Sequence, residues 1–98
     1  MLPSQILQKH RAAVLETMTR YPMFANLRVF GSVARREDTE ESDIDFLVDS
    51  ISGATLFDLS ELYDDFEALL GIPDHITITG ESMREPLRTV IKRDAISL

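Results

Sequence analysis

The chain has 98 residues, which is the size of one small domain (1–98) and leaves no room for a second. Apolar residues make up 44% and charged residues 28%, a globular rather than a disordered balance. The formal net charge of −7 argues against direct binding of nucleic acid through its phosphates, because that requires a basic surface.

The absence of cysteine excludes disulfides and zinc–thiolate sites. The N-terminal stretch MLPSQILQKHR turns polar too early for a signal peptide. No apolar run approaches the roughly 20 residues that a membrane span needs. We therefore expect a soluble, cytoplasmic protein that has no membrane partner.

The first half of the chain alternates helical and strand patterns. Apolar residues at helical spacing predict a helix over residues 4–20, which ends at Tyr21-Pro22. The next predicted elements are a strand at Leu27–Phe30, a short helix at 32–36, an acidic loop at 37–42 and a strand at Asp43–Asp49.

The second half begins with a helix signal. Thr55 and Asp58 have the spacing of a capping box, which predicts a helix from Thr55 to Leu70, and Gly71 is suited to its C-terminal end. The alternating residues His75–Thr79 predict a third strand. A last helix is expected from Pro86 to about Ala95.

This order of elements favours an α+β (mixed α/β) fold. We expect a small mixed sheet of three or four strands with helices packed on one face. The other face is then left for acidic side chains.

Asp43 and Asp45 are one residue apart in the second predicted strand. Residues i and i+2 of a strand point to the same face, so the two carboxylates lie side by side and repel each other. A divalent cation would neutralise them, and oxygen ligands suit Mg²⁺ or Mn²⁺.

A glycine–serine pair, Gly31-Ser32, ends the first strand and opens the short helix. Glycine lets the backbone approach a ligand closely, serine supplies a hydroxyl donor, and a helix start favours anions. A phosphate site beside a metal site is typical of phosphoryl or nucleotidyl transfer.

The stretch GSVARREDTEESDIDFLVD resembles the signature of the minimal nucleotidyltransferases, the smallest branch of the DNA polymerase beta superfamily. The matching positions are Gly31, Ser32, Ala34, Arg35, Ser42, Asp43, Asp45, Phe46, Leu47 and Val48. The resemblance implies a nucleotidyltransferase fold and transfer of a nucleoside monophosphate from ATP, with Mg²⁺, to an acceptor hydroxyl. Members of this size often act as antitoxins of HEPN-domain ribonuclease toxins, by adding AMP to a tyrosine.

The resemblance also implies roles for single residues. Gly31 and Ser32 would bind the triphosphate, and the catalytic residues Asp43 and Asp45 would hold the metal. Arg35 would be a further phosphate contact, and its alternative is a salt bridge to the loop at 37–41.

The superfamily usually places a third carboxylate on the next strand, and here that position is ambiguous. Asp74 is acidic, but it alternates in phase with Ile76 and Ile78, which should face the core. Either Asp74 bends toward the metal as a third ligand, or His75 takes the place of the acid, or the site is weakened. An exposed strand residue is the simplest interpretation of His75.

Two functions from different classes follow. The first is a metal-dependent nucleotidyltransferase whose acceptor is another protein, with a partner or a second copy of the chain completing the site. The alternative is a catalytically silent module that neutralises a basic partner by contact, steered by its acidic surface.

Overall fold

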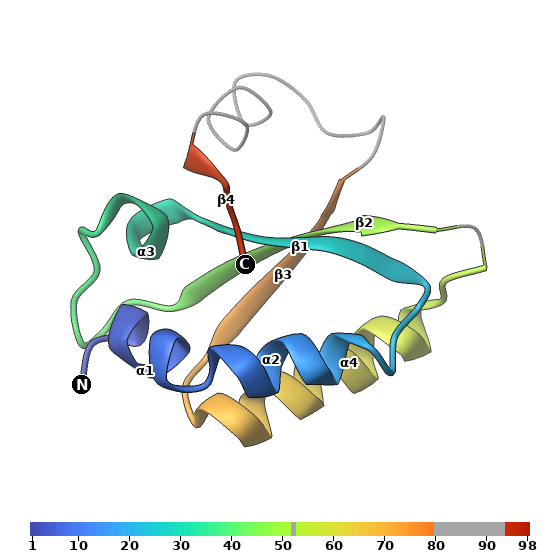
Figure 1. The fold of residues 1–98 in the computed structure, drawn as a ribbon, viewed down its shortest axis with the longest axis horizontal. Coiled ribbons are helices and arrows are strands. Elements are labelled where there is room, and N and C mark those ends of the chain that lie inside the picture. Colours follow the sequence, from blue (N-terminus) through green and yellow to red (C-terminus); the bar gives the residue numbers. More distant parts are fainter. Residues whose placement is uncertain (52, 80–93) are drawn as a thin grey trace.

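The computed structural model describes residues 1–51, 53–79 and 94–98, and within them the chain forms a four-stranded mixed sheet (Figure 1). The strands lie in the order β3-β2-β1-β4, and their bounds are Phe24–Phe30 (β1), Ile44–Ser50 (β2), Asp74–Thr79 (β3) and Ile96–Ser97 (β4). β2 pairs parallel with β3 and antiparallel with β1, which also pairs antiparallel with β4. The predicted α+β fold with a mixed sheet is confirmed.

Described helices from both halves of the chain cover one face of this sheet (Figure 1). The described helices are Pro3–Lys9 (α1), Arg11–Met18 (α2), Gly31–Arg35 (α3) and Leu56–Leu70 (α4). α1, α2 and α4 lie along the same face, whereas the short α3 follows the end of β1. The helix predicted from Pro86 to Ala95 falls outside the described residues, apart from its last two positions.

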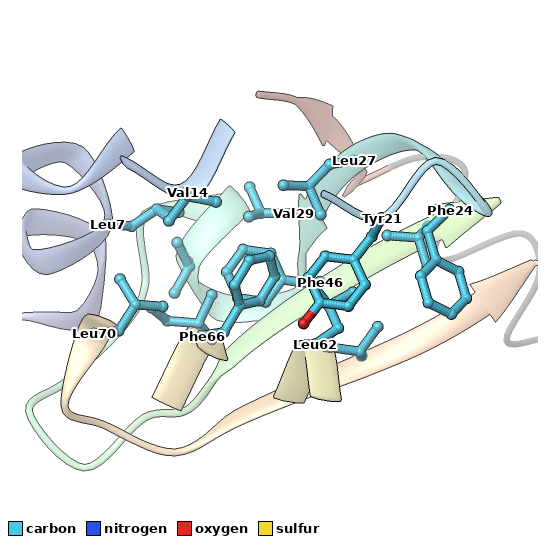
Figure 2. Packing of buried hydrophobic residues seen from close by; sticks show 14 residues of the cluster. Leu7, Val14, Tyr21, Phe24, Leu27, Val29, Phe46, Leu62, Phe66 and Leu70 are labelled. Atoms are coloured by element: carbon cyan, nitrogen blue, oxygen red, sulfur yellow. The ribbon is translucent and has the colours of Figure 1, made fainter. Parts of the chain in front are cut away.

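The hydrophobic core fills the space between these helices and the sheet (Figure 2). Ile44, Phe46 and Val48 of β2 are fully buried in it, and the ring centroids of Phe46 and Phe66 are 4.8 Å apart. These three residues of β2 occupy alternate positions, so Asp45 and Asp49 project from the opposite face. The predicted apolar face is confirmed, whereas the opposite face carries the buried Leu47 between Asp45 and Asp49 and is therefore acidic only in part.

The first helix is shorter than predicted and is interrupted at His10. His10 has φ −104° and ψ 12°, outside the helical range, and it separates α1 from α2. After Met18, the amides of Thr19 and Arg20 bond to carbonyls three residues back, a tighter turn that ends the helix. Residues 4–20 therefore form two helices.

β1 begins three residues earlier than the apolar pattern predicted. Asn26 has φ 57°, and the pairing with β2 shifts register between Ala25 and Arg28. This bulge interrupts the alternation of side chains, so the pattern is regular only from Leu27 onward. The alternation alone could not reveal the residues before it.

The capping box at the start of α4 is confirmed. The Asp58 amide donates to Thr55 Oγ1 at 3.2 Å, and the Thr55 amide donates to Asp58 Oδ2 at 2.8 Å. Among the residues that the structure describes, none of the helices has both the length and the apolar character to cross a bilayer.

Candidate active site

Gly31 and Asp45 are in contact because β1 and β2 pair in a register that sets Phe30 opposite Asp45. Gly31 has φ 70°, in the left-handed region that favours glycine. A Cβ atom on Gly31 would overlap Oδ2 of Asp45. The glycine bend and the strand acid, which the sequence predicted to be neighbours, therefore lie directly against each other.

Ser32 follows as the second residue of α3 and is half-buried. Its carbonyl accepts a bond from the Glu37 amide at 2.9 Å, which closes the turn after α3. Within the described ranges its hydroxyl has no hydrogen-bond partner, so it is free to donate to a ligand.

Asp43 immediately precedes β2, and its carboxylate meets His75 of β3. The distance from His75 Nε2 to Asp43 Oδ2 is 2.9 Å. An ionised carboxylate only accepts hydrogen bonds, so the imidazole donates. The parallel register of β2 and β3 also places His75 beside Asp45. Asp43, Asp45 and His75 thus form one polar group on the face away from the helices.

The carboxylate of Asp45 lies in an environment that disfavours its charge. Burial raises its pKa, and the nearby charge of Asp43 raises it further, although His75 and Arg35 act in the opposite direction. Among the described residues, no donor forms a hydrogen bond with this carboxylate. A cation bound at this position would therefore stabilise the ionised form.

Asp74 lies apart from this group, at the first position of β3. It pairs with Ile44 and alternates in phase with the buried Ile76. Its Oδ2 is buried and has no hydrogen-bond partner in the described part of the chain. Burial, followed by the charge of Glu67 on α4, raises its pKa to about 6. The structure places His75, and not Asp74, beside Asp45.

Arg35, at the end of α3, forms two ion pairs. Its Nε lies 3.1 Å from Glu37 Oε2, and its Nη1 lies 3.0 Å from Asp94 Oδ2. The first pair is the salt bridge to the loop that the sequence offered as the alternative to phosphate binding. Arg35 still lowers the pKa of Asp45, so its charge acts on the site.

The residues present fit a divalent cation that is shared with a substrate. Mg²⁺ is usually bound through one or two carboxylates, with water and substrate phosphates as the other ligands. Asp45 and the Oδ1 atom of Asp43 supply oxygens of this kind on one face. No cluster of three or more histidine, cysteine or acidic side chains in the described ranges could enclose a metal by itself.

Asp49, a further acid on the same face, was not assigned from the sequence. Its Oδ1 accepts from Arg28 Nη2 and Thr79 Oγ1, each at 2.6 Å, and its Oδ2 accepts from Asn26 Nδ2 at 3.1 Å. These bonds, that of Thr79 above all, lower its pKa. Asp49 alternates in phase with Asp45, and this pattern in the sequence could have placed it on the same face. Asp49 is satisfied by protein donors and marks the end of the acidic face.

Comparisons with known proteins agree with this geometry. Residues 10–97 match the model of the nucleotidyltransferase domain family. Two proteins of Methanocaldococcus jannaschii, both named for protein adenylyltransferase activity, are 35% identical over 91 residues and 37% identical over 93 residues. The first alignment covers 93% of this chain and 89% of the relative, and the second covers 94% and 90%.

Solved structures share the fold. One described as a minimal nucleotidyltransferase is 40% identical, with a TM-score of 0.77 over 97% of this chain and 95% of the other. A mutant of the MntA–HpeT toxin–antitoxin pair is 14% identical, with a TM-score of 0.70, and covers 88% and 69%. A toxin–antitoxin structure with AMP-PNP is 17% identical, with a TM-score of 0.69, and covers 87% and 69%. Family match, relatives and fold together show that this chain belongs to the nucleotidyltransferase domain family and is an enzyme of the minimal nucleotidyltransferase type.

Proposed function

We propose that this nucleotidyltransferase moves AMP from ATP to a hydroxyl of a partner protein, a tyrosine, and acts in the cytoplasm as the antitoxin of a HEPN-type toxin. The contact between Gly31 and Asp45 carries the proposal. It sets a bend suited to phosphate directly against a carboxylate that can share a cation with that phosphate.

The comparisons support the adenylyl group and the protein acceptor. The relatives from Methanocaldococcus jannaschii are named for protein adenylyltransferase activity, and one neighbour in fold was solved with AMP-PNP. The toxin–antitoxin neighbours have the same fold at low sequence identity, and this shared fold is what supports an antitoxin role. The HEPN identity of the partner comes from the resemblance of the Gly31–Val48 stretch to the minimal branch.

Asp43 and Asp45 would hold Mg²⁺ or Mn²⁺, which when bound neutralises charge on the α-phosphate and on the leaving pyrophosphate. The backbone at Gly31 and the hydroxyl of Ser32 would donate to phosphate oxygens. The acceptor oxygen forms a bond to the α-phosphorus while the bond from that phosphorus to the bridging oxygen breaks. Pyrophosphate leaves with the electron pair, and the hydroxyl proton passes to solvent. Arg35 contributes positive charge from the end of α3, and would exchange one of its acidic partners to reach a phosphate.

Transfer of label tests the proposal. The chain is incubated with the HEPN-domain partner, Mg²⁺ and ATP labelled at the α-phosphate. We expect label on a tyrosine of the partner, and its loss with Asp43→Ala or Asp45→Ala. Asp64→Ala, which removes an exposed acid of α4, is the matched control and should transfer normally. Label that persists in both aspartate variants would contradict the proposal.

One observation favours the silent binding module as a second candidate. Within the described residues, His75 occupies the position beside Asp45, and Arg35 is already paired with acids. A silent module predicts that the double variant Asp43→Ala/Asp45→Ala neutralises the partner as well as the wild type, without any transfer of label. Loss of neutralisation by the double variant would exclude it.

A further inference from the structure

His75 occupies a defined position next to both acids of the site. β2 and β3 are parallel, and His75 is the register partner of Asp45, so the two side chains leave the sheet on the same face. From there, Nε2 of His75 reaches Oδ2 of Asp43 at 2.9 Å. His75 of β3 therefore contacts Asp43, which lies one residue before the start of β2.

The hydrogen bond determines which oxygens of Asp43 remain available. The Nε2–H group donates to Oδ2, whichever charge the ring carries, because the ionised carboxylate can only accept. Oδ1 of Asp43 accepts no hydrogen bond in the described part of the chain, and neither does Asp45. The unengaged oxygens are thus Oδ1 of Asp43 and the carboxylate of Asp45.

The exposure of these side chains argues against a role in folding. The side chain of His75 is 63% exposed and that of Asp43 is 39% exposed. An exposed pair of this kind contributes little to the stability of a fold. The hydrogen bond from His75 instead restricts the rotation of the Asp43 carboxylate. Asp43 precedes β2, and no other described residue holds its side chain.

We propose that His75 is a positioning residue that orients Asp43 for a divalent cation without binding the cation itself. This inference rests on the proposed metal-dependent transfer and names the residue that organises its metal site. Hydrogen-bond donors that orient metal ligands typically change metal affinity 10–100-fold when they are removed. A direct bond from the imidazole is disfavoured, because Mg²⁺ and Mn²⁺ prefer oxygen ligands.

Two variants separate the donor from the ring. His75→Gln keeps an N–H donor at a similar reach, whereas His75→Leu removes the donor at similar bulk. Thr77→Val is the matched control, because Thr77 lies two residues further along β3 on the same face. Thermal unfolding in metal-free buffer should show all three variants folded.

Manganese binding is the measurement. Free Mn²⁺ is titrated by electron paramagnetic resonance with a fixed concentration of α,β-methylene-ATP, and the double variant Asp43→Ala/Asp45→Ala gives the background. We expect His75→Leu to weaken Mn²⁺ binding about tenfold. His75→Gln and Thr77→Val should stay close to the wild type. Spin-echo spectra of the wild type should show no nitrogen bound directly to manganese.

The outcomes distinguish this inference from the proposed function. Wild-type binding above background together with unchanged binding by His75→Leu overturns the positioning role and leaves the transferase intact. Equal losses in His75→Leu and His75→Gln, or a nitrogen bound to manganese, would show that the ring itself is a ligand and likewise overturn it. Wild-type binding no stronger than the background overturns both proposals.

Discussion

Gly31 decides how closely the backbone after β1 approaches the acidic strand. Its left-handed φ and its contact with the Asp45 carboxylate are separate constraints, and each disfavours a side chain. Gly71 shares the first constraint and not the second. It has φ 72°, and in the described part of the chain no residue beyond its local backbone neighbours lies within 4 Å of the position that a Cβ atom would take there. Alanine variants of the two glycines therefore separate the effect of backbone strain from the effect of a clash with Asp45.

We expect Gly31→Ala to abolish nucleotidyl transfer and to lower the free energy of unfolding by about 1–3 kcal/mol. Gly71→Ala should cost about 1 kcal/mol through its backbone alone and should leave transfer unchanged. Urea unfolding and the transfer assay measure the two effects. Equal activity of the two variants would show that the contact between Gly31 and Asp45 has no role in the site.

The raised pKa of Asp74 should make the free energy of unfolding depend on pH. Its folded-state pKa, about 6, lies above that of an unfolded aspartate, so its favourable contribution is complete below about pH 4 and is lost as the pH rises through 6. Asp74→Asn should therefore become more stable than the wild type as the pH rises from about 4 to 7. The gain should be about 1–2 kcal/mol, after allowance for partial exposure.

Urea unfolding of both proteins across this pH range measures the effect, with Asp64→Asn as an exposed control. Parallel curves for the wild type and Asp74→Asn would contradict the burial of an ionisable Asp74. The difference between the curves isolates Asp74 from the other acids that titrate in the same range.

The alternation of residues predicted that Asp43 and Asp45 share one face, although β2 begins one residue later than predicted and leaves Asp43 just outside it. The same alternation left the role of β3 undecided. Asp43 and Asp45 could be found because alternation fixes the face of a strand residue. The same rule gave Asp74 the phase of Ile76, and the structure agrees. The bond from His75 to Asp43 could not be predicted, because it depends on the direction and register of β3 against β2.

At the level of elements, Tyr63 joins α4 to the edge strand β3. The amide of Ile76 donates to the Tyr63 hydroxyl at 2.8 Å, and that hydroxyl donates to the carbonyl of Ile76 at 3.2 Å. The hydroxyl thereby satisfies both backbone groups of Ile76 on the side of β3 that has no neighbouring strand among the described residues. Because His75 precedes Ile76, this anchor also fixes the strand that carries the histidine.

Tyr63→Phe should destabilise the protein by about 1–2 kcal/mol, since it leaves two backbone groups without their partner. It should also weaken Mn²⁺ binding through displacement of His75. Tyr21→Phe, which removes a hydroxyl that donates to Asp65 away from β3, is the control. A loss of stability in both variants with a loss of binding only in Tyr63→Phe is the expected pattern, measured by urea unfolding and the manganese titration.

The type and order of the described elements up to β3 could be predicted from the sequence, whereas their interruptions and the short strand β4 could not. α4 was found with its capping residues because Thr55 and Asp58 act within a single turn. The break at His10 and the bulge at Asn26 are the two interruptions that the periodicity did not predict. Neither position has the glycine or proline that marks most interruptions.

At the level of the whole molecule, the hydrophobic core and the candidate active site lie on opposite faces of the sheet. The face toward α1, α2 and α4 is apolar and packed (Figures 1 and 2). The opposite face carries Asp45, Asp49 and His75. With a net charge of −7, the chain has unfavourable electrostatics at the site in the absence of a cation. The acids that are proposed to bind the cation therefore lower the stability of the fold when no cation is bound.

Asp45→Asn tests this trade-off. In metal-free buffer near neutral pH the variant should be more stable by about 0.5–1 kcal/mol, because it removes a charge that burial disfavours. Mg²⁺ should raise the melting temperature of the wild type and leave that of the variant unchanged. A variant that melts below the wild type without metal would contradict the explanation.

The central claim is that the Gly31 bend and the acids Asp43 and Asp45 together bind a metal–triphosphate. Isothermal titration calorimetry with Mg²⁺ and AMP-PNP tests it most directly. We predict saturable binding of one nucleotide per chain, which disappears when Mg²⁺ is chelated and in Asp43→Ala/Asp45→Ala. Absence of binding by the wild type, or binding of equal strength by the double variant, would contradict it.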